Sequence, residues 1–339
     1  MSPHNPEYDL YDAKHFARYR GWLPASKAFV RESGKTTIKY FTLCAAQAID
    51  VFMFEREGLL RRDDQDQLHD VVICEKNEEI VPEILELVRP PLREALIVGK
   101  LEDILLADIS QSNSSEDPRS LIARRNQRNR EHFMQLERYF PFDVINFDTC
   151  GSLVNKPLDA NRLLAALDRV FELQQSASSF LLFVTTPISD LCGELEGIFR
   201  ERLSENVRSH NEIHQALVTS TGSVVYDEIE RRSRIALGFA KSILLPMAQK
   251  HGWNALHKGI YVYNSPSGRT TMMSSVVKLS ATRSESDSGT YISDIVQIIR
   301  NMPRSYSSEN SQQKDEVRRH LGGIIDYREE VRSRYTLSR

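Results

Sequence analysis

The feature that most constrains this chain is a repeated unit in which a short, continuous apolar run precedes a stretch with helical periodicity. Such runs lie near residues 39–43, 70–74, 95–99, 142–147 and 180–185. Continuous runs of this kind are typical of parallel strands buried on both faces, and the intervening helices supply the crossovers that parallel strands need. We therefore predict an α/β fold with one open, mostly parallel sheet and helices on both faces.

Two further apolar runs, within residues 260–279, flank the sequence Ser265-Pro266-Ser267-Gly268. Turn-forming residues between two such runs favour a β-hairpin. We expect this antiparallel hairpin to close the parallel sheet.

The 339 residues divide into three parts. Residues 1–35 predict an N-terminal helical cap of one or two short helices, broken at Pro24. Residues 36–280 carry the strands, and residues 108–140 within them form a Ser-rich loop and an Arg-rich helix. Residues 281–339 predict a flexible linker, a short helix at 292–299 and a charged C-terminal helix.

Composition excludes several classes of protein. Hydrophobic residues make up 40% and charged residues 27% of the chain, which is typical of a packed globular protein. The net charge of −3 does not by itself predict nucleic-acid binding. We expect a cytoplasmic protein with no membrane segment, because no apolar run approaches the roughly 20 residues that span a bilayer.

Metal-binding patterns are also missing from the sequence. The four cysteines are scattered without a CxxC pair, and we expect no metal site. His210 and His214 are four residues apart, and His251 and His257 flank Trp253. Without an HExxH motif or a third ligand, we expect these histidines at the surface.

Ligands of open parallel sheets bind at the carboxyl ends of the strands, so the residues that follow each run are the candidate site. Glu75 follows the second run, Gly99 the third and Asp148 the fourth. A carboxylate in the position of Glu75 can accept hydrogen bonds from ribose hydroxyls, although a solvated turn glutamate beside Lys76 fits the sequence equally well.

Asp148-Thr149-Cys150-Gly151 is similar to the Asp-Pro-Phe/Tyr-Gly motif of nucleic-acid amine methylases. With Glu75 and the strand pattern, it makes residues 36–280 resemble class I S-adenosylmethionine-dependent methyltransferases, whose sheet is Rossmann-like. The resemblance implies that Asp148 is catalytic and orients an amine acceptor. It also implies that S-adenosylmethionine is bound by residues after the first three strands, namely Cys44, Ala45, Gln47, Glu75, Gly99, Leu101 and Glu102.

The motifs depart from the family pattern at three places. The glycine-rich turn is replaced by Leu43-Cys44-Ala45-Ala46-Gln47-Ala48, and alanine adopts positive φ at a higher cost than glycine. Lys100 stands where the family has an aspartate, and Thr149 and Cys150 replace the proline and the aromatic residue. A pseudoenzyme is therefore one interpretation.

The arginines of the insertion offer a second candidate site. Arg124, Arg125 and Arg128 share helical faces and could contact the phosphates of RNA or DNA, while a simply solvated helix is the alternative. Three functions stay open: a methyltransferase acting on a nucleic-acid amine, a non-catalytic scaffold that binds a protein partner through its C-terminal helix, and another nucleotide-dependent enzyme.

Overall fold

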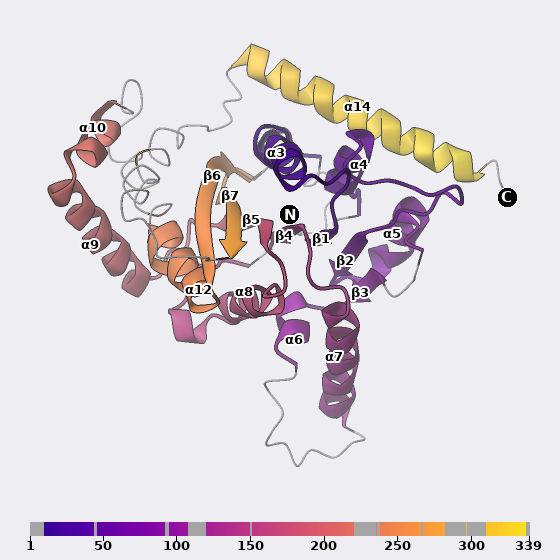
Figure 1. The fold of residues 1–339 in the computed structure, drawn as a ribbon, viewed down its shortest axis with the longest axis horizontal. Helices are drawn as coiled ribbons and strands as arrows, with labels where there is room; N and C mark the ends of the chain where they lie inside the picture. Colours follow the sequence, from indigo (N-terminus) through magenta and orange to yellow (C-terminus); the bar gives the residue numbers. More distant parts are fainter. Residues whose placement is uncertain are drawn as a thin grey trace.

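The computed structural model describes residues 10–43, 46–91, 95–107, 120–149, 151–219, 235, 238–265, 267–281, 296 and 310–336. At its centre lies a seven-stranded sheet with the order β3-β2-β1-β4-β5-β7-β6 (Figure 1). The strands are β1 (Tyr40–Leu43), β2 (Val71–Glu75), β3 (Leu96–Val98), β4 (Val144–Asp148), β5 (Ser179–Pro187), β6 (Trp253–Asn264) and β7 (Thr271–Ala281).

Strand directions confirm the predicted fold class. Neighbouring strands from β3 across to β5 are parallel, whereas β7 is antiparallel to both β5 and β6. All five predicted parallel strands are present, and the hairpin is longer than expected because β6 begins at Trp253. The second strand of the hairpin, rather than the first, pairs with β5.

Helices lie on both sides of this sheet (Figure 1). The α-helices are α2 (Asp12–Ala17), α3 (Leu23–Ser33), α4 (Ile49–Arg56), α5 (Val81–Val88), α6 (Leu101–Leu105), α7 (Leu121–Glu137), α8 (Arg162–Leu173), α9 (Gly193–Ser209), α10 (Asn211–Thr219), α12 (Leu245–Lys250) and α14 (Ser311–Thr336). Two π-helical turns, η1 (Arg18–Trp22) and η6 (Phe239–Leu244), and two 3₁₀ turns, η2 (Glu78–Ile80) and η5 (Leu158–Ala160), complete the elements.

Because side chains alternate along a strand, each face of the sheet has its own core. We call the two faces the cap face and the insertion face. Cap-face strand residues pack against the N-terminal helices, α4 and α14; they include Tyr40, Ile73, Val144, Phe183 and Val276. Insertion-face strand residues pack against α6, α7, α8, α9 and η6; they include Phe41, Val72, Ile145, Leu182 and Val277.

The N-terminal cap differs from its prediction at Pro24. The chain stays helical from α2 through η1 into α3, and Pro24 occupies the first turn of α3. Proline is tolerated there because the backbone N–H groups of a first turn need no acceptor within the same helix. The predicted break at Pro24 is therefore wrong. The irregular part of the cap is the π-helical turn η1, which precedes Pro24.

The C-terminal helix α14 runs along the outside of the cap and α4 (Figure 1). Its buried residues follow helical spacing and belong to the cap-face core; they are Val317, Leu321, Ile324 and Val331. The apolar stripe of this helix is thus used within the chain. The Ser-rich loop at 108–119 and most of the predicted helix at 292–299 lie outside the described residues.

Candidate strand-end site

Four polar side chains form a row across the cap face where the strands end. By strand register, Glu75 on β2 and Asp148 on β4 both lie level with the residue that follows Leu43 on β1. Thr185 pairs with Asp148, and Ser274 pairs with Thr185. Alternation places all four side chains on the face that carries Ile73, Val144, Phe183 and Val276. We call Glu75, Asp148, Thr185 and Ser274 the strand-end row.

Glu75 occupies the place that the sequence predicts. Its side chain is buried, and its Oε1 accepts a hydrogen bond of 2.7 Å from the backbone N–H of Asn77. Burial raises the pKa of the Glu75 carboxyl, and the Asn77 hydrogen bond opposes that shift. The position supplies a carboxyl group at the strand end, with part of its hydrogen-bonding capacity used by its own turn.

Asp148 is engaged by a residue that sequence reasoning missed. The Nζ of Lys14, on α2, lies 2.8 Å from the Asp148 Oδ2, and the two side chains are only 7% and 9% exposed. Lys14 is 134 positions from Asp148 in the chain, and nothing in a polar N-terminal segment marks it as a partner. The structure therefore places an amine against the carboxylate predicted to orient one.

The rest of the row anchors the cap. The Trp22 indole N–H donates to the Ser274 Oγ at 3.1 Å, and the Thr185 hydroxyl donates to the same oxygen at 3.1 Å. The Trp22 ring stacks on Phe183 with centroids 5.0 Å apart. These contacts fix η1 directly over the carboxyl end of β5.

A second buried carboxylate, Asp50, lies next to the row. Its Oδ2 accepts hydrogen bonds from the Tyr40 hydroxyl at 2.5 Å, the Thr42 hydroxyl at 2.7 Å and the Asn146 amide at 3.2 Å. Burial, followed by the charge of Asp50, raises the pKa of the Tyr40 hydroxyl. The Oδ1 of Asn146 is buried and has no hydrogen-bond partner among the described residues.

The residue before α4, Ala48, takes a backbone conformation that a glycine would favour. Ala48 has φ 47° and ψ 35°, in the left-handed region, and it is fully buried at the start of α4. Such a conformation costs a non-glycine residue roughly 1–2 kcal/mol. Gln47 is half-buried, and Cys44 and Ala45 lie outside the described residues.

The residues that follow β3 make contacts with other parts of the chain. Gly99 has φ 155°, and a Cβ at this position would lie 3.1 Å from the Ile104 Cδ1. Leu101 is buried in the insertion-face core, whereas Glu102 is half-buried. Asp103 forms ion pairs with Arg125 and, at 3.0 Å, with Arg162.

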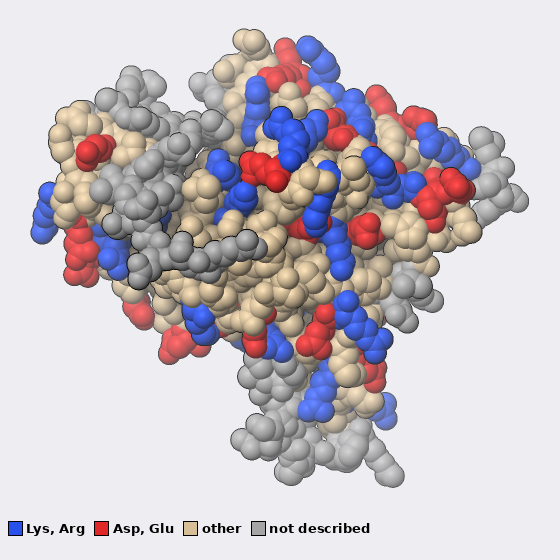
Figure 2. Space-filling view, viewed as in Figure 1, with Lys and Arg blue, Asp and Glu red and all other residues tan. Residues whose placement is uncertain are grey.

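The three predicted nucleic-acid arginines are exposed on α7, which projects from the body of the molecule (Figure 1). Arg125 pairs with Asp103, and Arg128 pairs with Glu78 at 2.9 Å. In Figure 2, basic and acidic side chains alternate over the visible face. Two of the three guanidiniums therefore have carboxylate partners within the chain.

One of the histidines that the sequence places at the surface is buried. His257 is buried, so its predicted surface position is wrong, and burial lowers its pKa to about 3. The signal was available, because His257 follows Trp253 and Ala255 at a spacing of two on one face of β6. Within the described ranges, no group of three potential metal ligands occurs.

Comparison with known proteins adds one match. A family described as PP_RS20740-like matches residues 111–274, which include α7, Asp148 and most of the hairpin but neither Glu75 nor the cap. No curated protein and no solved structure matches the chain. In the part of the chain that the structure describes, every helix is too short or too polar to cross a membrane.

Proposed function

We propose that this chain is a methyltransferase-like protein that holds S-adenosylmethionine at the carboxyl ends of β1, β2 and β3 and presents a nucleic-acid amine at Asp148. The observation that carries the proposal is the strand-end row. Glu75 and Asp148 project from one face at one level, with a single strand between them. Two strand spacings correspond to about 10 Å, which suits a ligand that contacts one carboxyl group through its ribose and the other through its reacting end.

The residues present fit such a ligand. Glu75 can accept hydrogen bonds from ribose hydroxyls, and Ala48, the residue before α4, has a glycine-like left-handed conformation. The buried Oδ1 of Asn146, two residues before Asp148 on the same face, is an acceptor that a ligand N–H or O–H would satisfy. When bound, S-adenosylmethionine would supply an activated methyl group and would leave as S-adenosylhomocysteine.

Asp148 would act on the acceptor. Its carboxylate accepts an N–H from the amine and holds the nitrogen in a fixed orientation, which favours transfer by removing rotational and translational freedom. The nitrogen gains a carbon bond and must lose a proton, and Asp148 is the carboxylate in the strand-end row placed to receive it.

One observation favours the alternative of a non-catalytic scaffold. Asp148 is buried in an ion pair with Lys14, so the carboxylate is not open to an external amine in this conformation. A scaffold would show no saturable binding of S-adenosylmethionine.

Calorimetric titration of the full chain with S-adenosylmethionine and S-adenosylhomocysteine tests the proposal. Glu75→Ala should weaken binding by about 10- to 150-fold, the equivalent of roughly 1.5–3 kcal/mol for hydrogen bonds to a charged group. Glu83→Ala, an exposed glutamate on α5, is the matched control and should bind as the wild type does. No saturable binding at millimolar ligand would favour the scaffold.

Nucleic-acid contact is tested by the salt dependence of binding to a single-stranded oligonucleotide. If the three α7 arginines contact phosphates, replacing all three by glutamine should reduce the slope of log affinity against log salt by up to about 2. The matched control replaces three arginines of α9, namely Arg200, Arg202 and Arg208. Equal slopes for the two triple variants would contradict a role for α7.

A further inference from the structure

Helix α2 and the first residue of η1 turn three basic side chains inward. Lys14, His15 and Arg18 are 6%, 0% and 2% exposed. An apolar residue at any of these positions could also pack against the sheet. Replacing a whole buried ion pair by apolar residues of similar volume is often neutral or stabilising, although removing only one partner is costly. The presence of Lys14 against Asp148 therefore calls for an explanation other than cap stability.

The Lys14 ammonium occupies the position that the proposed function assigns to the acceptor. Its Nζ lies 2.8 Å from Asp148 Oδ2, which is hydrogen-bond distance for an amine held by that carboxylate. One carboxylate oxygen buried at this depth cannot hold a second amine in the same place. Lys14 and an external acceptor therefore compete for Asp148.

Helix α2 packs through Ala13, Phe16 and Ala17 in the cap-face core, so Asp148 becomes accessible only when these contacts open. Trp22 and Phe29 anchor η1 and α3 in the cap-face core. The link to α2 is η1 itself, and π-helical turns are rare and frequently lie at functional sites. Movement of α2 about η1 would uncover Asp148 without removing the anchored part of the cap.

Polar contacts with α14 hold α2 and η1 down. The His15 Nε2 lies 2.9 Å from the His320 Nδ1, and the Arg318 guanidinium donates to Asp12 at 2.6 Å. The Tyr19 hydroxyl donates to Glu316 at 2.9 Å. The contacts of Arg318 with Asp12 and of Tyr19 with Glu316 are partly exposed and contribute little each, whereas His15 is buried.

We propose that Lys14 is an internal pseudosubstrate: the pocket at Asp148 binds an aliphatic ammonium group, and α2 keeps it filled with Lys14 until an acceptor amine displaces it. The acceptor-site part of this inference rests on the proposed function, whereas the amine selectivity of the pocket can be measured without S-adenosylmethionine. The inference names a mode of autoinhibition and a ligand class, primary alkyl ammonium, which mimics Lys14. A nucleobase amino group is neutral and would have to donate its N–H to Asp148 in the same place.

Chemical rescue of Lys14→Ala tests the pocket. The substitution removes three methylenes and the ammonium, and n-propylamine replaces those atoms. Propylammonium should raise the thermal midpoint of Lys14→Ala in a saturable way, because a ligand that binds only the folded state stabilises it. It should not raise the midpoint of the wild type or of Lys14→Ala/Asp148→Asn, and 1-propanol, the neutral counterpart, should have little effect on any of them.

Equal shifts with propanol, or equal rescue of the double variant, would overturn the inference, since the void would then be merely apolar. A second measurement uses the wild type and does not depend on the folding of any variant. Propylammonium chloride should speed hydrogen exchange of the α2 amides relative to sodium chloride at the same ionic strength. Identical exchange in the two salts would show that Lys14 is not displaced.

The two proposals fail separately. Rescue by propylammonium without S-adenosylmethionine binding would keep the amine pocket and reject the methyltransferase proposal. Binding of S-adenosylmethionine without rescue would keep that proposal and reject the pseudosubstrate.

Discussion

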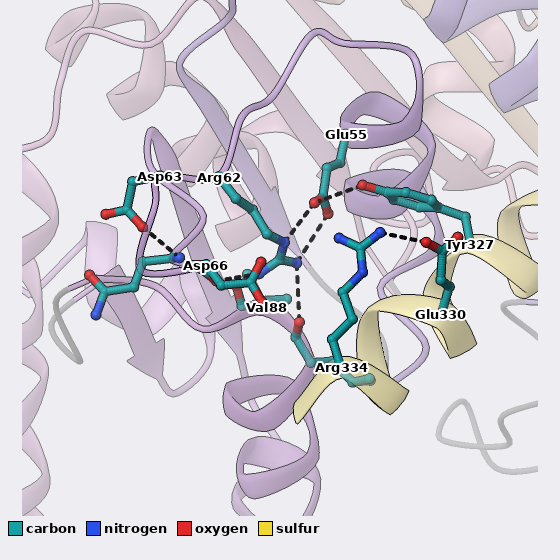
Figure 3. A network of polar contacts seen from close by, with 10 residues as sticks. Glu55, Arg62, Asp63, Asp66, Val88, Tyr327, Glu330 and Arg334 are labelled. Atoms are coloured by element: carbon teal, nitrogen blue, oxygen red, sulfur yellow. Dashed lines mark hydrogen bonds and ion pairs between the residues drawn. The ribbon is translucent and has the colours of Figure 1, made fainter. Parts of the chain in front are cut away.

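Arg62 should be one of the most costly single residues to replace outside the apolar core. Its guanidinium forms a two-pronged ion pair with Glu55, with Nε–Oε1 2.6 Å and Nη2–Oε2 3.0 Å. It also donates to the backbone carbonyls of Leu87 and Val88, at the end of α5, and of Asp66. Figure 3 shows this network reaching α14 through the Tyr327 hydroxyl, which donates to Glu55 at 3.0 Å.

The magnitude follows from burial. The side chains of Arg62 and Glu55 are 7% and 5% exposed, so solvent screens their interaction weakly. Arg62→Met leaves the Glu55 carboxylate buried without its counter-ion, and breaking a buried pair in this way costs about 3–5 kcal/mol of unfolding free energy. Tyr327→Phe removes one hydrogen bond to a charged acceptor and should cost roughly 1.5–3 kcal/mol.

The control lies in the same figure. Glu330 pairs with Arg334 at 2.5 Å on the surface of α14, with side chains 60% and 52% exposed (Figure 3). Glu330→Gln should cost at most about 0.5 kcal/mol. Urea unfolding followed by the fluorescence of Trp22 and Trp253 compares the variants, since a change in midpoint at constant slope reports stability. A shift for Arg62→Met no larger than that for Glu330→Gln would refute the reasoning.

Three further predictions use the same assay. Lys14→Met should cost about 3–5 kcal/mol by leaving Asp148 unpaired, and Lys14→Met/Asp148→Asn should recover most of it; additive losses would contradict the pairing. The pKa of His257 is about 3 in the folded state, below its ordinary value of 6.5. The stability linked to this group is therefore fully present above about pH 6.5 and is lost as the pH falls toward 3. Between about pH 7 and 5 the wild type should lose about 2 kcal/mol through this group, and His257→Leu should remove that loss. Gly21→Ala should destabilise by about 1–3 kcal/mol, because its Cβ would lie 2.5 Å from the Tyr261 ring, whereas Gly197→Ala, with open space around it, should stabilise by up to about 1 kcal/mol.

Much of the fold follows from the sequence alone. Each apolar run is long enough for one strand, and the helices between the runs require parallel crossovers, so the sheet and its closing hairpin were predictable. Glu75 and Asp148 were found by the same route, because the ends of parallel strands meet at one edge of a sheet. The place of Glu75 and Asp148 at the carboxyl ends of their strands is confirmed, whereas their roles stay a prediction.

Predictions from the properties of single residues differed from the structure at two positions, Pro24 and Ala48. The sequence predicts a break at Pro24, but the chain continues from a π-helical turn into α3, and Pro24 lies in the first turn of that helix. The sequence presents Ala48 as a poor substitute for glycine, yet Ala48 adopts the left-handed conformation at a fully buried position. At Ala48, packing of the surrounding chain outweighs a preference of about 1–2 kcal/mol, whereas Pro24 meets no penalty in the first turn of α3.

Pairing across long sequence separations was decided only by the tertiary structure. Lys14 meets Asp148, and Tyr327 meets Glu55 over 272 positions, because the cap and α14 fold onto the same face of the sheet. A charged residue shows its charge in the sequence but not its partner, since the partner depends on how helices dock. The sequence by itself determined the sheet and the carboxyl groups at its edge, and the docking of the two chain ends determined that one of those groups is already occupied by an amine.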